Sequence, residues 1–225
     1  MEERREKDLL LCLVQKELFM TTINKNNILG VILAGGLSKR MGKINKSLAK
    51  INDKTLLEIS YNLVRKQLNH VIINSNINLK KKININFEVI PDKIPGYLGP
   101  LSGILSAMHW AKNNLPDCKW IASFPVDSVF FPNNFVEIMV DKINNKTQIV
   151  CAKSNGRVHP VFALWSIELI YDLEKALVED GLRKIDKWTK DYNLEIITFK
   201  KSSIDPFFNI NTKEDLDLAK NYLRN

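Results

Sequence analysis

Glycines and basic residues share one short stretch of this sequence. Residues 33–42 read Leu-Ala-Gly-Gly-Leu-Ser-Lys-Arg-Met-Gly, and Lys46 follows four residues later. Glycines let a backbone approach a phosphate closely, and free backbone N–H groups can cradle it. Arg40 offers a planar fork to phosphate oxygens, whereas Lys46 offers a point charge. The combination predicts a phosphate-binding loop, although its spacing fits neither G-x-G-x-x-G nor G-x-x-x-x-G-K-[ST].

The segments around this loop alternate between strand and helix patterns. Residues 28–34 form an apolar run typical of a strand buried on both faces of a parallel sheet. The pattern predicts an α/β fold, a single-domain three-layer sandwich with a mostly parallel, Rossmann-like open sheet. Further strands are expected at residues 71–74, 87–90, 120–124, 149–152, 161–165 and 195–199, and helices at 54–68, 101–111, 168–178 and 181–190, with a last helix capped by Thr212 and Asp215.

Composition narrows the class of protein. The 225 residues are 45% hydrophobic and 26% charged, close to globular averages. No apolar run approaches the ~18–20 residues needed to span a bilayer, and residues 1–20 lack the basic start and long apolar core of a signal peptide. The cysteines, Cys12, Cys118 and Cys151, show no C-x-x-C spacing, which argues against structural zinc and fits a reducing compartment. We therefore expect a cytoplasmic protein.

The loop belongs to a longer series of motifs. The string L-A-G-G-x-S-x-R-M-G-x-x-x-K resembles the signature loop of the MobA-like family, the nucleotidyltransferases related to molybdenum cofactor guanylyltransferase. The resemblance extends over residues 28–220 in the expected order. Its further segments are Val71–Asn76, Val89–Asp92, Gly99–Gly103, Phe124–Asp127, Arg157–Pro160 and Asn209–Thr212. We assign residues 28–225 to a nucleotidyltransferase domain. Residues 1–27 are an extension whose first 19 residues have no counterpart, either a short helix or the product of a mis-set translation start.

The resemblance implies a reaction and its participants. GTP and the molybdopterin cofactor would give the guanine dinucleotide cofactor and pyrophosphate, with Mg²⁺. The implied catalytic residues are Arg40, Lys46 and Asp127, with Asp127 as the metal ligand. Nucleotide contacts are implied at Leu33, Ala34, Gly35, Gly36, Lys46, Asn74, Asp92 and Asp127, and pterin contacts at Arg157, His159, Asn209 and Asn211. Molybdenum-insertion and accessory cofactor proteins are further implied partners, and we expect a monomer.

Elementary chemistry supports these assignments. Displacement at the α-phosphorus requires neutralised charge on the triphosphate and on leaving pyrophosphate, which cationic side chains supply. Mg²⁺ needs only one or two protein carboxylates when phosphates complete its shell, so Asp127 suffices. A phosphate monoester has a second pKa of about 6, so the nucleophile is already mostly ionised and needs no general base. That agrees with the lack of a convincing Ser-His-Asp or Cys-His set in the sequence.

Several of these residues also have ordinary structural explanations. Asp127 could cap a helix after Pro125, Asn74 could form a strand-end turn, and Asp92 could stabilise a loop. His159 precedes a proline and could be a packed loop histidine. Trp110, Trp120 and Trp165 are expected in the core. The sequence departs from the family pattern at Asn45, where aspartate is usual, and at Phe124 and Val126, where cysteines are often found.

Other functions remain open from the sequence. A sister enzyme could use CTP or a sugar or alditol substrate, but such enzymes commonly have proline where Asn45 stands. A non-catalytic carrier of nucleotide or pterin would not need the metal ligand Asp127. The net charge of +8 suggests an anionic partner, but a nucleic-acid-binding module would cluster its basic residues with exposed aromatics, and the lysines here are scattered. We expect no nucleic-acid partner and no membrane partner.

Overall fold

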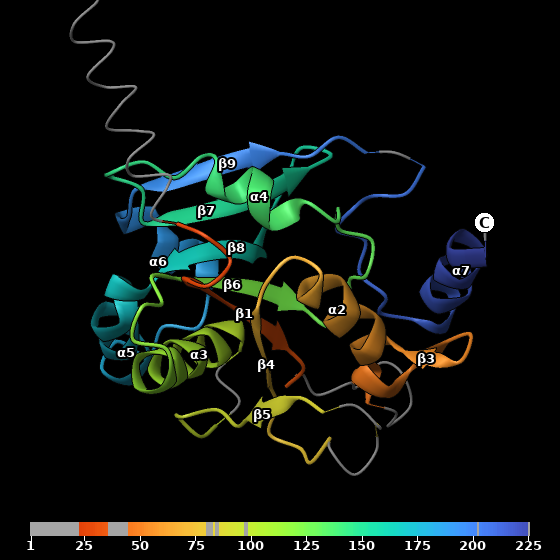
Figure 1. Ribbon diagram of the computed structural model, residues 1–225, viewed down its shortest axis with the longest axis horizontal. Helices are drawn as coiled ribbons and strands as arrows, with labels where there is room; N and C mark the ends of the chain where they lie inside the picture. Colours follow the sequence, from red (N-terminus) through yellow and green to blue (C-terminus); the bar gives the residue numbers. More distant parts are fainter. Residues whose placement is uncertain are drawn as a thin grey trace, which may run out of the picture.

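A seven-stranded sheet organises the chain. The computed structural model describes residues 23–35, 45–79, 83, 86–96, 99–201 and 203–224. The strand order is β5-β4-β1-β6-β8-β7-β9 (Figure 1). The strands are β1 (Ile28–Leu33), β4 (His70–Asn74), β5 (Glu88–Ile90), β6 (Trp120–Pro125), β7 (Ile149–Ser154), β8 (Arg157–Ser166) and β9 (Leu194–Thr198). Among these strands β8 alone runs antiparallel to its neighbours, so the expected mostly parallel sheet is confirmed.

Strand β1 lies inside the sheet and is buried on both faces. Ile28 and Ile32 point to one face of the sheet and join one hydrophobic cluster. Leu29 and Val31 point to the other face and join a second cluster. Alternate side chains of a strand point to opposite faces, so only a continuous apolar run can fill both clusters. This explains the strand pattern at residues 28–34.

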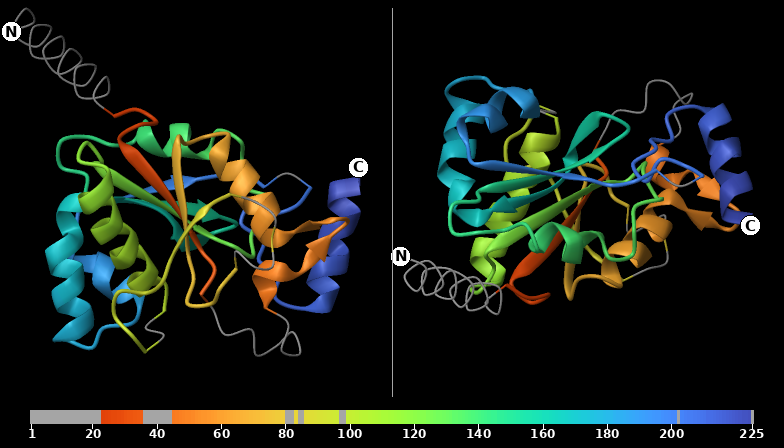
Figure 2. Two further views of the ribbon diagram at one scale, coloured as in Figure 1. Left: turned by 60° about the horizontal axis from the view of Figure 1, so that its bottom comes forward. Right: turned by 90° about the horizontal axis from the view of Figure 1, so that it is seen from above.

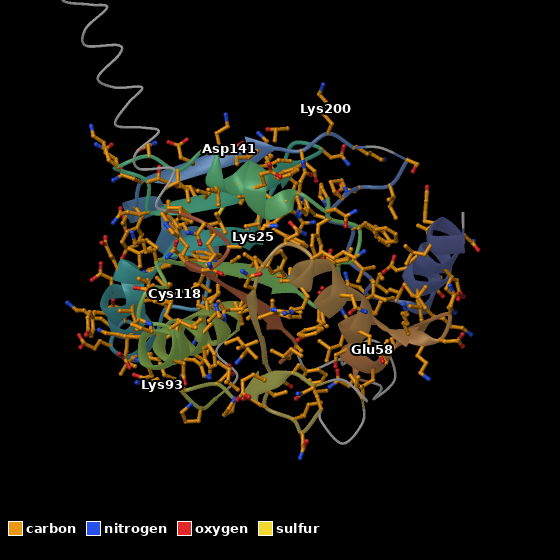
Figure 3. The ribbon with its side chains drawn as sticks, viewed as in Figure 1. Lys25, Glu58, Lys93, Cys118, Asp141 and Lys200 are labelled. Carbon is orange, nitrogen blue, oxygen red and sulfur yellow. The ribbon has the colours of Figure 1, made fainter. Side chains whose placement is uncertain are left out.

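Helices cover both faces of the sheet and give the expected three layers. One layer holds α2 (Leu56–Arg65) and α4 (Phe135–Val140), and the other holds α3 (Pro100–Asn114), α5 (Ile170–Val178) and α6 (Ile185–Trp188). The right-hand view of Figure 2 shows the two layers on opposite sides of the sheet. Helix α2 begins with a capping box, in which Thr55 and Glu58 satisfy each other's backbone N–H groups (Glu58 is labelled in Figure 3).

A small unit packs beside the main sheet. It combines the two-stranded hairpin of β2 (Lys50–Ile51) and β3 (Lys54–Thr55) with the last helix, α7 (Lys213–Arg224). Ile51, Ile210 and Ala219 form part of its hydrophobic cluster. The expected cap of α7 is present, because Asp215 Oδ2 accepts the Thr212 N–H at 2.9 Å and Thr212 Oγ1 accepts the Asp215 N–H at 3.1 Å.

The sequence prediction missed the shortest elements. The hairpin strands have two residues each and α4 has six, too few to show a clear period. The helix expected at 181–190 is only α6 followed by the 3₁₀ turn η3 (Thr189–Asp191). Two more 3₁₀ turns are η1 (Lys46–Leu48) and η2 (Ile167–Leu169). The three tryptophans expected in the core are there, with Trp120 and Trp165 buried and Trp110 partly buried against the cluster.

No helix in the described part of the chain combines the length and apolar character needed to cross a membrane.

Candidate active site

A cleft opens where the parallel strands end. β1, β4, β5 and β6 run in one direction, and the register places Leu33 beside both Asn74 and Pro125. The carboxyl ends of these strands therefore share one edge of the sheet, where ligands of open α/β sheets bind. The cleft has a volume of ≈ 410 Å³ and is lined by Leu33, Ala34, Gly35, Asn45, Lys46, Ser47, Asn74, Asp92, Gly99, Pro100, Pro125, Val126, Asp127 and Val161.

Lys46 enters the cleft from a capped 3₁₀ turn. The side-chain oxygen of Asn45 accepts the Ser47 N–H at 2.9 Å and the Ser47 hydroxyl at 2.6 Å, which fixes the start of η1. Aspartate would accept the same two hydrogen bonds, so Asn45 keeps the local structure that the family pattern requires. Lys46 is thus the first residue of a short, well-anchored turn.

Lys46, Asp127 and Asn211 converge from distant parts of the chain. The Lys46 ammonium lies 3.0 Å from Asp127 Oδ2 and also donates to Asn211 Oδ1. Asp127 stands two residues after β6, and its carbonyl accepts the Ile210 N–H at 2.8 Å, which holds Asn211 beside it. α4 begins only at Phe135, so Asp127 does not cap a helix. The side chains of Lys46 and Asp127 are 19% and 20% exposed, enough to meet a ligand in the cleft.

Asp92 is held by two asparagines. Asn74 donates its amide to Asp92 Oδ1 at 3.0 Å, and Asn76 donates to Asp92 Oδ2 at 2.8 Å. Asn74 is buried and reaches across to β5, so it does not form a strand-end turn. Lys93, next to Asp92, donates its backbone N–H to Ser106 Oγ of α3 at 2.8 Å, and its ammonium lies 3.4 Å from Glu174 of α5 (Lys93 is labelled in Figure 3). The carboxylate therefore stands on a loop anchored on both sides.

The turn after β1 offers one backbone donor. The Ala34 N–H donates a hydrogen bond to the Asn74 carbonyl at 2.9 Å. Among the described residues none accepts the Gly35 N–H, and Gly35 lines the cleft. Of the implied nucleotide contacts in this turn, Gly35 is therefore the residue whose backbone N–H can donate to a ligand in the cleft. Gly36 and Arg40 lie outside the described residues, and their assignments stay predictions.

The start of α3 also borders the cleft. Gly99 precedes the helix with a φ of 83°, a left-handed conformation that favours glycine, and Pro100 takes the first helical position. The positive end of the helix dipole thus lies at the cleft and favours an anionic ligand there. The sequence segment Gly99–Gly103 indicated a helix start but did not by itself show that the start would line the site.

The donor set suits a hard cation that is bound mainly by its substrate. No group of three or more His, Cys, Asp or Glu side chains able to hold a metal occurs in the described part of the chain. The described residues therefore do not form the closed cage of Cys and His side chains that is typical of structural zinc. One carboxylate at Asp127 with the neighbouring amide oxygen of Asn211 matches Mg²⁺, which takes few protein ligands and relies on phosphate oxygens.

Comparison with known proteins agrees with this geometry. Residues 30–193 match the MobA-like NTP transferase domain. A molybdenum cofactor guanylyltransferase of Nitrobacter hamburgensis is 37% identical over 192 residues, which cover 85% of this chain and 92% of the relative. The protein of the same name from Bradyrhizobium sp. is 34% identical, covering 89% of this chain and 95% of the relative.

The chain belongs to the MobA-like NTP transferase family. It is a nucleotidyltransferase. Solved structures share the fold at lower identity. Molybdopterin-guanine dinucleotide biosynthesis protein A from Archaeoglobus fulgidus matches with a TM-score of 0.68 and 18% identity, covering 87% of this chain and 98% of that one. A 4-diphosphocytidyl-2C-methyl-D-erythritolsynthase from Anaerococcus prevotii matches with a TM-score of 0.65 and 15% identity, covering 91% and 99%. The predicted family and fold are therefore confirmed.

The four residues assigned to the pterin substrate differ in their relation to the Lys46–Asp127 pair. Asn211 contacts Lys46, and Asn209 follows closely, with its side-chain oxygen accepting the Ser128 hydroxyl at 2.9 Å. Arg157 and His159 lie at the start of β8, and His159 packs on Phe207, two residues before Asn209. Only the Asn209–Asn211 segment is therefore brought to the Lys46–Asp127 pair, and the pterin role of all four residues stays a prediction.

His159 is packed into a hydrogen-bonded cluster. Its Nε2 lies 2.8 Å from Ser154 Oγ, and the Ser154 hydroxyl is 2.8 Å from Asp205 Oδ1 and 2.9 Å from Oδ2. A hydroxyl has one proton, which goes to the carboxylate, so His159 Nε2 must be the donor to Ser154. The ring also packs on Phe207, with centroids 4.9 Å apart. Burial lowers the pKa of His159, with Asp205 opposing the effect and Arg157 adding to it, which favours the neutral imidazole.

Val161 lines the cleft because β8 bulges. Cys151 of β7 pairs with Ala163, yet the next residue, Ala152, pairs with His159, so three residues of β8 have no partner on β7. Pro160 lies in this bulge and has no N–H to give to a ladder. The Ser123 hydroxyl accepts the Trp165 indole N–H at 2.8 Å and donates to the Val161 carbonyl at 2.6 Å. Pro160, directly before the strand predicted at residues 161–165, is the sequence signal of this irregularity.

Replacing Gly103 by alanine should destabilise the protein and displace Asn74. A Cβ at Gly103 would lie 2.6 Å from Leu33 Cδ2 and closer still to Asn74 Oδ1, so buried groups must move. Overpacking of this kind typically costs about 1–3 kcal/mol in unfolding free energy. Thermal and urea unfolding of Gly103→Ala will measure the loss. Gly35→Ala is the matched control, because its Cβ would meet the same Asn74 oxygen at an ordinary 3.8 Å. Equal stability of the two variants would contradict the close packing of α3 on Asn74.

Proposed function

We propose that this protein transfers GMP from GTP to the terminal phosphate of molybdopterin in its molybdenum-bound form, giving the guanine dinucleotide cofactor and pyrophosphate. The observation that carries the proposal is the meeting of Lys46 and Asp127 in the cleft that also contains Asp92. The Lys46–Asp127 pair suits a triphosphate with its cation, and the Asp92 carboxylate suits a base with N–H donors. The names of the relatives, which are 34–37% identical to this chain over most of its length, support the same reaction.

The reaction requires charge stabilisation more than proton transfer. An oxygen of the pterin phosphate forms a bond to the α-phosphorus, and the bond from that phosphorus to the bridging oxygen breaks as pyrophosphate leaves with the electron pair. The Lys46 ammonium would bind phosphate oxygens as negative charge moves onto the leaving group. Mg²⁺ held at Asp127 would supply further positive charge at the same oxygens. The phosphate nucleophile is mostly ionised at neutral pH, so neither His159 nor another base is needed.

Binding of the metal-bound triphosphate favours a rearrangement of the Lys46–Asp127 pair. The Lys46 ammonium lies 3.0 Å from Asp127 Oδ2, so it repels a divalent cation that binds this carboxylate, and movement of the ammonium away from Asp127 relieves the repulsion. The triphosphate offers the ammonium new anionic partners in the same cleft. We therefore propose that Lys46 passes from Asp127 to the phosphates as the nucleotide enters.

Guanine differs from adenine and cytosine in having adjacent N–H donors beside a carbonyl. Each Asp92 oxygen has two lone pairs and accepts one amide hydrogen bond, so each can also accept an N–H from the base. The Gly35 N–H can donate to the carbonyl of guanine. A site with such polar groups rejects the wrong base strongly, because its own groups would then be left unpaired.

Two further proposals concern the pterin contacts and the cellular compartment. Asn209 and Asn211 are proposed contacts for the pterin, since their segment reaches Lys46, whereas Arg157 and His159 would meet only a more distant part of that substrate. Cys118 and Cys151 are buried free thiols, as expected of a reducing compartment, so we propose that the protein acts in the cytoplasm.

The direct test is turnover with purified molybdopterin, Mg²⁺ and each nucleoside triphosphate. We expect kcat/KM for GTP to exceed that for CTP and ATP by at least ~10²-fold. Dinucleotide product and pyrophosphate should appear in equal amounts. Equal use of GTP and CTP would assign the protein to cytidylyl transfer, and nucleotide binding without product would indicate a carrier.

Replacing Asp92 by asparagine should shift the base preference from guanine toward xanthine. Xanthine has a carbonyl where guanine has its C2 amino group, so its partner must donate a hydrogen bond there, which a carboxylate cannot do. We expect the ratio of kcat/KM for XTP to that for GTP to rise by ~10-fold or more. Asp53→Asn, at the exposed turn between β2 and β3, is the control and should keep the wild-type ratio. An unchanged ratio in Asp92→Asn would place the base elsewhere.

A further inference from the structure

Asn76 makes two reciprocal hydrogen bonds with one residue. Its Nδ2 donates to Asp92 Oδ2 at 2.8 Å, and its Oδ1 accepts the backbone N–H of Asp92 at 2.8 Å. The opposite orientation of the amide would place donor against donor and oxygen against oxygen, so the pairing defines which end is which. Asn76 is exposed, yet both ends of its side-chain amide are hydrogen-bonded to Asp92, the residue proposed to bind the guanine base.

The two asparagines together fix the plane of the carboxylate. A carboxylate with one partner can still turn about its Cβ–Cγ bond. Asn74 holds Oδ1 and Asn76 holds Oδ2, so such a turn would break both hydrogen bonds. Asn76 also holds the backbone of Asp92, so the position of the whole residue depends on it. The remaining lone pair on each oxygen then has a defined direction toward a ligand.

Asn76 itself stays outside the cleft. Asn74 and Asp92 line the cleft, whereas Asn76 lies on the exposed bend after β4. That bend is supported by the Ser75 hydroxyl, which accepts the Ile77 N–H at 3.3 Å, and by the Ser75 N–H, which donates to the Ile90 carbonyl at 2.9 Å. Any effect of Asn76 on the nucleotide must therefore pass through Asp92.

We propose that Asn76 is a positioning residue that sets the selectivity for guanine by orienting the Asp92 carboxylate. The inference rests on the proposed reading of guanine by Asp92, and it adds a residue that does not touch the nucleotide. Discrimination between bases depends on the direction of the two acceptors, whereas the triphosphate is bound at Lys46 and Asp127 in another part of the cleft. Loss of Asn76 should thus reduce selectivity and leave the chemical step unchanged.

The test measures dissociation constants for GTP, ATP and CTP by calorimetry, together with kcat at saturating GTP. In Asn76→Ala the preference for GTP over ATP should fall by roughly fivefold to tenfold, as expected for the loss of charge-assisted hydrogen bonds. kcat should stay within about threefold, since the phosphate end is untouched. Asn78→Ala is the matched control, an exposed asparagine of the same loop that makes no hydrogen bond to Asp92, and it should behave as wild type.

A double-mutant cycle separates positioning from a general structural role. If Asn76 acts through Asp92, Asn76→Ala should change the base preference in the wild-type background and have no further effect in an Asp92→Ala background. Wild-type preference in Asn76→Ala, or equal losses in both backgrounds, would overturn the inference while the proposed function stands. Absence of a preference for GTP in the unmodified protein would instead overturn the proposed reading of guanine, and the inference with it.

Discussion

Replacing Lys46 by methionine should lower turnover by at least ~10²-fold, because Lys46 is the one cationic side chain among the described residues that line the cleft beside Asp127. Methionine keeps much of the apolar stem of lysine and removes only the ammonium, so packing around η1 should survive. The measurement is kcat/KM for GTP in the presence of Mg²⁺. Lys50→Met, at an exposed lysine four residues along, is the control and should keep activity near wild type.

The same variant should bind a divalent cation more tightly than wild type in the absence of nucleotide. The Lys46 ammonium competes for Asp127 Oδ2, and a partly exposed ion pair of this kind contributes about 1 kcal/mol, which is roughly fivefold in Kd. Titration with Mn²⁺, followed by the electron paramagnetic resonance signal of the free ion, measures this affinity. Weaker Mn²⁺ binding in Lys46→Met would contradict the exchange proposed for Lys46.

A structural role for Lys46 gives a different pattern. Both partners keep about a fifth of their side-chain surface exposed, so water can hydrate Asp127 when the ammonium is lost. We expect unfolding free energy to fall by about 1 kcal/mol in Lys46→Met, far less than the change in activation free energy. A large loss of stability with near-normal turnover would show that the ion pair mainly supports the fold.

The sequence could predict the sheet and the edge at which ligands bind. Residues 28–33 contribute side chains to a hydrophobic cluster on each face of the sheet, so their continuous apolar character indicates a strand inside the sheet. Strands β1 and β4 end at the predicted site residues Leu33 and Asn74, and strands β5 and β6 end two residues before Asp92 and Asp127. Once the sheet is parallel, these residues must share an edge.

The pairings within the site could not be predicted. Lys46 meets Asp127 and Asn211 across 81 and 165 residues of chain, and no local pattern records such a contact. Asn76 was visible in the motif around Asn74, but nothing in its type or spacing showed that both ends of its amide would face Asp92. The bulge that brings Val161 to the cleft depends on a change of register between β7 and β8, which a period-two pattern does not reveal.

Replacing Asp127 by asparagine should reduce turnover by ~10³-fold or more. The change keeps the size of the side chain and removes the charge that holds Mg²⁺ beside the triphosphate, and metal stabilisation of phosphoryl charge amounts to several kcal/mol. Product formation over a range of Mg²⁺ concentrations will show whether excess metal restores any activity. Asp141→Asn, at the exposed end of α4 and labelled in Figure 3, is the control and should leave the magnesium dependence unchanged.

Combining Asp127→Asn with Lys46→Met shows which role the carboxylate has. A carboxylate needed only to neutralise Lys46 would become dispensable once the ammonium is gone, and the double variant would be at least as active as Lys46→Met alone. A carboxylate that holds the metal remains necessary, so the double variant should lose turnover further. It should also lose the tighter Mn²⁺ binding expected of Lys46→Met, because that gain depends on Asp127. Tight Mn²⁺ binding in the double variant would place the metal on other residues and overturn the assignment of Asp127.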